Sequence, residues 1–143
     1  MNISPESYAE ICKQLAFISA LLAGFSFAFI GVLLTSELNE KIIDWVIGFS
    51  ISAIAGFLIC SLAWTLSSSR MAIYTQSNIK ELPALFISLH KTLSLLFIFS
   101  FFLFVVTLGL SGWIRSRKLG IVSGIIALFS GAFFIWLLSN FMK

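Results

Sequence analysis

The sequence predicts an all-α integral membrane protein with four transmembrane helices, and three observations support this. Charged residues make up only 10% of the 143 residues, whereas hydrophobic residues make up 59%. Four runs of 23 to 25 residues contain no Asp, Glu, Lys or Arg: 14–36, 45–69, 92–114 and 119–142. A hydrocarbon core about 30 Å thick needs about 20 apolar residues in a helix. The runs also lack the alternation of barrel strands, so each predicts one helical span.

The expected spans are about 14–36, 43–68, 91–114 and 119–142. The connections between them leave no room for a soluble domain, so residues 1–143 are expected to form a single four-helix transmembrane domain. The first run is too long for the apolar part of a signal peptide, and we expect it to be retained as a span.

The first helix is expected to begin well before its span. Ser4 suits a helix cap, Pro5 the first helical position and Glu6 the positive end of the helix dipole. Pro83 can open the third helix in the same way. Both helices would then be about 30 residues and about 45 Å long, and would extend beyond the bilayer on the N-terminal side. Alternatively, 83–90 lies flat on the interface as a separate amphipathic turn.

The second helix is expected to continue past the membrane on the same side, through the sequence SSSRMAIYTQ. Together, the extensions of the first three helices would form a short helical collar that also carries Lys13. The candidates for docking a partner lie here and around the 70–82 loop: Arg70, Lys80, His90 and Lys91. His90 is most simply an interfacial polar residue, and sensing of pH is the alternative.

Basic residues are nearly balanced between the two sides of the predicted membrane. The N-terminal side has five and the opposite side four, the latter including the compact RSRK at 115–118. The small excess favours cytoplasmic N and C termini in a plasma or inner membrane, whereas the compact RSRK argues for the reverse. Such a near balance would also permit insertion in both orientations. The formal net charge of +3 is ordinary for a membrane protein, and no basic cluster resembles a nucleic-acid footprint, so nucleic acid is not an expected partner.

The ionisable residues do not suggest catalysis or coupled transport. No predicted span has one near its middle, where an ion-coupled transporter needs a carboxylate. There is no paired acid and no nucleophile with a base, so an enzyme is not expected. Cys12 and Cys60 form no CxxC pair, and with a single histidine they cannot build an ordinary metal site. We therefore expect no cofactor and no metal.

Small residues recur at helix-packing spacing in three of the helices. These packing candidates are Ala20, Gly24, Ala28 and Gly31 in the first helix, Gly48, Ser52 and Gly56 in the second, and Gly120, Gly124, Ala127 and Gly131 in the fourth. Such faces allow close approach, so the first helix is expected to pack on the second and fourth. Packing inside one subunit and packing between copies in a homo-oligomer are both open.

Hydroxyl groups on the first helix suggest a pore. Ser19 and Ser26 are seven residues apart, and with Ala23 they would line a channel formed by a ring of first helices. The alternative is that each hydroxyl bonds the carbonyl one turn back.

The heptapeptide SALLAGF, Ser19 to Phe25, resembles the start of the pore helix in Orai-type calcium channel subunits. Lys13 is similarly placed to a basic position of that helix. The resemblance implies a ring of first helices with the other three helices outside it. The glutamate of that family's filter would fall at Val32, so no calcium site is carried over.

Two functions follow as expectations. The first is an oligomeric pore or channel-like subunit, including membrane-permeabilising effectors, lined mainly by the first helix and gated by dewetting. The alternative is a non-conducting assembly, immunity or sensor protein that docks a partner through its N-terminal-side helical extensions and the 70–82 loop. The expected partners are membrane lipid, further copies of the chain and a protein on the N-terminal side.

Overall fold

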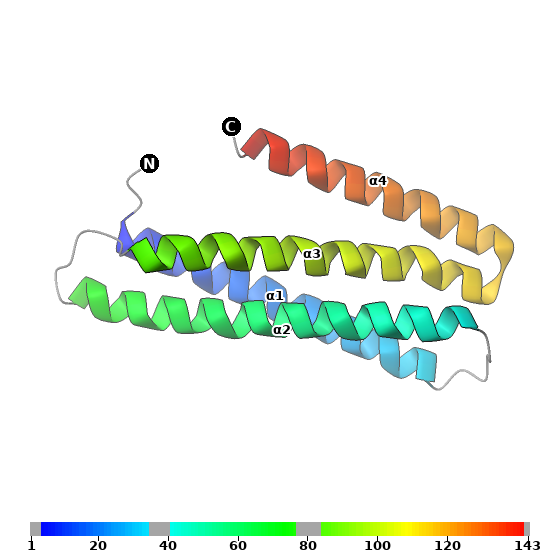
Figure 1. The fold of residues 1–143 in the computed structure, drawn as a ribbon, viewed down its shortest axis with the longest axis horizontal. Coiled ribbons are helices and arrows are strands. Elements are labelled where there is room, and N and C mark those ends of the chain that lie inside the picture. The colour runs from blue at the N-terminus through cyan, green and yellow to red at the C-terminus, as the bar shows by residue number, and fades with distance from the viewer. Residues whose placement is uncertain (1–3, 35–40, 77–83, 142–143) are drawn as a thin grey trace. The chain divides into compact units, whose positions relative to one another are not determined.

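The computed structural model describes residues 4–34, 41–76 and 84–141, and nearly all of them are helical. Helix α1 spans Pro5–Leu34, α2 Lys41–Gln76, α3 Ala84–Arg115 and α4 Arg117–Phe141 (Figure 1). The all-α prediction is confirmed over this part of the chain. Helix α3 runs unbroken from Ala84, so residues 84–90 belong to this helix and do not form a separate turn. Pro83 itself lies outside the described residues.

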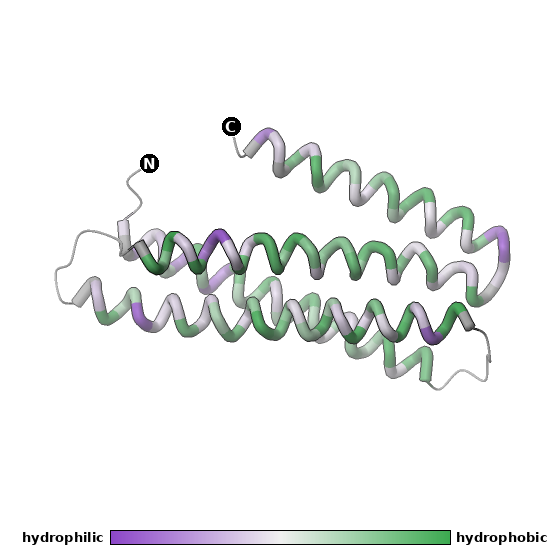
Figure 2. The backbone as a smooth tube through the Cα atoms, in the orientation of Figure 1, coloured by the Kyte–Doolittle hydropathy of each residue, from purple (hydrophilic) through white to green (hydrophobic). Residues whose placement is uncertain are grey.

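All four helices are long and apolar enough to cross a membrane, over Glu6–Leu34, Ile42–Tyr74, Leu85–Ile114 and Arg117–Leu137. Figure 2 shows hydrophobic residues along the whole of each helix, with the most hydrophilic positions mainly toward the helix ends. Large apolar side chains are exposed on every helix. Monomeric soluble proteins rarely expose large contiguous apolar surfaces, so the four helices suggest a multi-pass membrane protein.

Hydrogen bonds fix the start of two helices. The Ser4 Oγ accepts a hydrogen bond from the Ser7 amide at 3.2 Å, and the Ser4 carbonyl accepts one from the Tyr8 amide at 3.0 Å. At α4, the Ser116 Oγ accepts from the Leu119 amide at 3.2 Å. Caps of this kind satisfy amides that have no partner within the helix, and the predicted start of α1 at Pro5 is confirmed.

The chain divides into two compact units, and α1, α2 and α3 contribute to both. The first unit comprises Met1–Phe25 and Ile54–Phe99; the second comprises Ser26–Ala53 and Ser100–Lys143. The core of the first unit is rich in aromatic and sulfur-containing side chains: Tyr8, Cys12, Ala16, Cys60, Trp64, Met71, Phe86 and Leu93. Both of its cysteines are free and fully buried. A cluster in the second unit is aliphatic: Leu33, Ile43, Val46 and Ile114.

Within the second unit, glycine brings α3 and α4 close together beside the residues that connect them. A Cβ atom at Gly112 would lie 2.6 Å from the carbonyl oxygen of Leu119. The Ser123 Oγ donates a hydrogen bond across the same contact to the Gly109 carbonyl at 2.8 Å. Backbones approach this closely only where no side chain intervenes.

Candidate functional site

The three pore-lining candidates of α1 are buried inside their own chain. Ser19, Ala23 and Ser26 are 0%, 3% and 1% exposed. The Ser19 Oγ donates to the Leu15 carbonyl at 2.8 Å, which is the usual way that a hydroxyl is satisfied within a helix. A pore lined by these side chains requires them to face water, so their pore-lining role stays a prediction.

The small residues of α1 lie on another, exposed face of that helix. Ala20, Gly24, Ala28 and Gly31 are all exposed, and we call them the open stripe. A Cβ atom at Gly24 or Gly31 would meet no described atom within 4 Å beyond the helix itself. Within the described part of the chain these two glycines therefore have no close neighbour from another helix.

The remaining packing candidates divide between closed and open positions. Gly56, Gly120 and Gly131 are buried, Gly124 and Ala127 are half-buried, and Gly48 and Ser52 are exposed. A Cβ atom at Gly120 would lie 2.5 Å from the ring of Trp113, whereas one at Gly48 or Gly124 would meet no described atom within 4 Å. The same spacing therefore marks a tight contact at some positions and open surface at others.

The docking candidates that the structure describes lie in the first unit. Arg70 and Lys91 are exposed and His90 is half-buried; Lys80 lies outside the described residues, as does the loop from 77 onward. Lys13 pairs with Glu10 one turn away at 3.7 Å. Among the described residues no carboxylate pairs with Arg70 or Lys91.

His90 packs against two aromatic rings in the first unit. Its ring centroid lies 5.6 Å from that of Tyr8 and 6.3 Å from that of Trp64. The Tyr8 hydroxyl donates to the Phe86 carbonyl at 3.3 Å. The Trp64 Nε1 and the His90 Nδ1 are both buried without a hydrogen-bond partner in the part of the chain described. His90 is thus held by aromatic packing and is only partly accessible to a partner.

A groove between α2 and α3 opens beside Arg70, and we call it the collar groove. Its volume is about 250 Å³, and it is lined by Ala63, Leu66, Ser67 and Arg70 from α2 and by Leu85, Phe86 and Leu89 from α3. The three leucines are exposed. An apolar groove with a cation at its edge suits an amphipathic helix that carries a carboxylate.

Sequence reasoning missed the collar groove. Its signal is a pair of four-residue steps on the helix extensions, Leu66 to Arg70 and Leu85 to Leu89, because residues four apart share a helix face. Trp64 gives no such signal, since aromatic residues make up 15% of the chain.

Among the residues that the structure describes, no three metal-ligating side chains form a cluster. No protein-family model, curated protein or solved structure matches this chain. The candidate site is therefore assigned from its own geometry.

Proposed function

We propose that the chain is a four-span integral membrane protein that binds a partner protein through the collar groove. The observation that carries the proposal is an apolar groove with the exposed guanidinium of Arg70 at its edge. Grooves of this kind take the apolar face of a helix. A carboxylate on that helix would form charge-assisted hydrogen bonds with Arg70. The proposed partner is therefore a protein with an apolar helix that carries an acidic residue.

The charge on α2 favours the same partner. Arg70 lines the groove and has no carboxylate partner among the described residues. Complementary charge steers association and excludes partners of the wrong sign. With a cytoplasmic N-terminus, the groove would lie at the cytoplasmic face of a plasma or inner membrane. Assembly, immunity and sensor proteins act through contacts of this type.

A photo-crosslinking amino acid at Leu85, inside the groove, or at Ile87, outside it, tests the proposal. The two positions are matched, because both lie in the first turns of α3 and are 69% and 49% exposed. In native membranes we expect the amino acid at Leu85 to give one defined protein adduct. The same adduct from Ile87 should be about tenfold weaker. The adduct should disappear in Arg70→Glu and persist in Arg70→Lys, which keeps the charge.

Adducts of equal strength from both positions would contradict groove docking, and so would an adduct that survives Arg70→Glu. Crosslinks only to lipid would show that the groove faces the bilayer, and crosslinks only to the same chain would show self-association. Each variant is first checked for helicity and a cooperative thermal transition, so that a lost adduct reports binding and not unfolding.

A homo-oligomeric pore is the second candidate function, and the open stripe of α1 favours it. Its small residues are spaced four, four and three apart, so two copies of α1 could approach to backbone contact. In this arrangement the copies would meet through the face of α1 that its own chain leaves open.

Gly24→Leu is expected to weaken self-association about tenfold, because a leucine side chain would hold two stripes apart. Counting fluorescent subunits by stepwise photobleaching in nanodiscs measures the change. Ile18→Trp is the control, since it adds bulk at an exposed α1 position outside the stripe. If the two variants weaken self-association equally, the open stripe is not the interface between copies.

Efflux of ions and small dyes from liposomes then decides whether an oligomer conducts. Efflux that is lost in Gly24→Leu supports the pore. Absence of efflux from protein that is inserted and oligomeric favours the docking of a partner through the collar groove.

A further inference from the structure

We infer that a groove between α3 and α4 binds a phospholipid with an anionic headgroup. The acyl chain would lie in the groove and the headgroup at the start of α4. The groove has a volume of about 500 Å³ and lies entirely within the second unit. Pockets for small molecules are typically about 300–1,000 Å³. The inference rests on the membrane insertion proposed above, but not on the collar groove.

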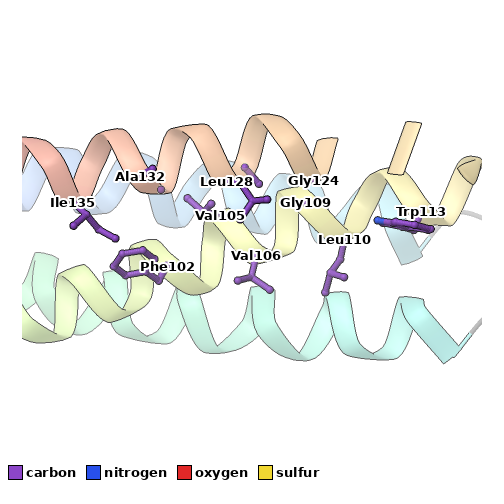
Figure 3. A pocket seen from close by; sticks show the side chains of 12 residues that line it. Phe102, Val105, Val106, Gly109, Leu110, Trp113, Gly124, Leu128, Ala132 and Ile135 are labelled. Atoms are coloured by element: carbon purple, nitrogen blue, oxygen red, sulfur yellow. The ribbon is translucent and has the colours of Figure 1, made fainter. Parts of the chain in front are cut away.

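The walls of this lipid groove are apolar along its length. Phe102 and Val106 from α3 and Leu128 and Ile135 from α4 are among the residues that line it (Figure 3). Gly124 also lines it, and a Cβ atom there would meet no described atom within 4 Å. Glycine therefore leaves room at this position, and the apolar walls accept a hydrocarbon chain, which needs no hydrogen-bond partner.

Contacts between the two helices keep the groove from closing or widening. A Cβ atom at Gly109 would lie 3.1 Å from the Cβ of Ala127, so the helices already touch there. The rings of Phe101 and Phe134 lie with their centroids 4.2 Å apart. A groove that is already formed binds a ligand without an ordering penalty of its own.

The cations of α4 lie at one end of the lipid groove. Trp113 lines that end (Figure 3), and its ring packs on Gly120, only three residues after α4 begins at Arg117. Arg117 and Lys118 are exposed, and neither pairs with a carboxylate among the residues described.

Tryptophan concentrates at the membrane–water interface, and basic residues at that depth attract anionic headgroups. An apolar groove that ends at an interfacial tryptophan and two exposed cations therefore fits one kind of molecule. That molecule is an amphiphile with a hydrocarbon chain and a negative head.

Quenching of Trp113 by brominated lipid tests the inference. In a Trp45→Phe/Trp136→Phe background the two other exposed tryptophans are removed, and Trp64, at 1% exposed, remains as a shielded reference. The protein is placed in phosphatidylcholine vesicles that contain a minor fraction of brominated phosphatidylglycerol or of brominated phosphatidylcholine. We expect phosphatidylglycerol to quench Trp113 with about tenfold higher apparent affinity.

Arg117→Glu/Lys118→Glu should remove this preference, and Gly124→Leu should reduce quenching by filling the groove. Arg117→Lys, which keeps the charge, and Ser130→Leu, which adds bulk at an exposed α4 position that does not line the groove, are the controls. Neither should alter quenching. If Gly124→Leu fails to fold, the inference is still tested by comparing the quenching by the two brominated lipids in Arg117→Glu/Lys118→Glu.

Equal quenching by the two lipids would overturn the anionic site and leave membrane insertion standing. A phosphatidylglycerol preference that survives the double charge reversal would also overturn it. Absence of quenching by either lipid would overturn insertion, and the inference with it.

Discussion

Gly112→Ala is expected to destabilise the protein by about 1–3 kcal/mol, because the added methyl group has no room between α3 and α4. Its Cβ would lie 2.6 Å from the Leu119 carbonyl oxygen and 2.8 Å from the carbonyl carbon. These are backbone atoms of the first turn of α4, so no side-chain rotation can relieve the contact. The helices would have to move apart, which would also strain the hydrogen bond from Ser123 to Gly109.

Gly24→Ala and Gly124→Ala are the matched controls for this prediction. Both glycines are in helix interiors, and a Cβ atom at either would meet no described atom within 4 Å. Alanine there should stabilise the helix by about 0.5–1 kcal/mol, since glycine loses more backbone entropy on folding. The free energy of unfolding of all three variants is measured in mixed detergent micelles, with the loss of helicity as the signal. Changes of the same sign and size would show that α3 and α4 are not packed as described.

The sequence was sufficient to predict the four helices, because the positions of charged residues along the chain do not depend on how the chain folds. A run without charge that is long enough for a bilayer predicts a helix wherever it occurs, and each such run lies largely within a helix of the structure. Local chemistry at Ser4 and Pro5 likewise predicted the start of α1, since a cap depends on neighbours along the chain.

The sequence could not show which face of α1 is buried. A water-soluble helix reveals its buried face by a contrast between polar and apolar sides, but α1 is apolar nearly all round. Its two candidate faces differ only in carrying hydroxyls, at Ser19 and Ser26, or glycines, at Gly24 and Gly31. Both kinds of residue are small and pack closely between helices. Sequence spacing therefore identified both faces, and only the structure shows that the hydroxyl face is buried.

The fourth helix shows the same limit within one motif. In GIVSG, Gly120 lies under the Trp113 ring, whereas Gly124 opens into the lipid groove. The GxxxG step predicts that a backbone can be approached at both positions. Whether another helix or an acyl chain does so depends on residues of α3, which a pattern in α4 does not contain.

Trp64→Ala is expected to cost about 3–5 kcal/mol, the range for removing a large aromatic side chain from a core. Trp64 is 1% exposed, and its ring contacts those of His90 and Phe97 at centroid distances of 6.3 and 5.7 Å. The contact with His90 joins α2 to α3 next to Leu89, which lines the collar groove. The substitution should therefore also loosen the groove and weaken the crosslink from Leu85.

Trp64→Phe separates packing from hydrogen bonding at the same position. The Trp64 Nε1 is buried with no hydrogen-bond partner in the described chain, so its removal relieves an unsatisfied donor while most of the ring contact remains. We expect the free energy of unfolding to change by less than about 1.5 kcal/mol. Trp136→Ala is the control for truncation, because Trp136 is 58% exposed. A loss in Trp64→Phe as large as in Trp64→Ala would mean that the indole N–H does have a partner. That partner would be a bound water or the neighbouring His90 Nδ1, and the aromatic core of the first unit would then depend on a polar contact as well as on packing.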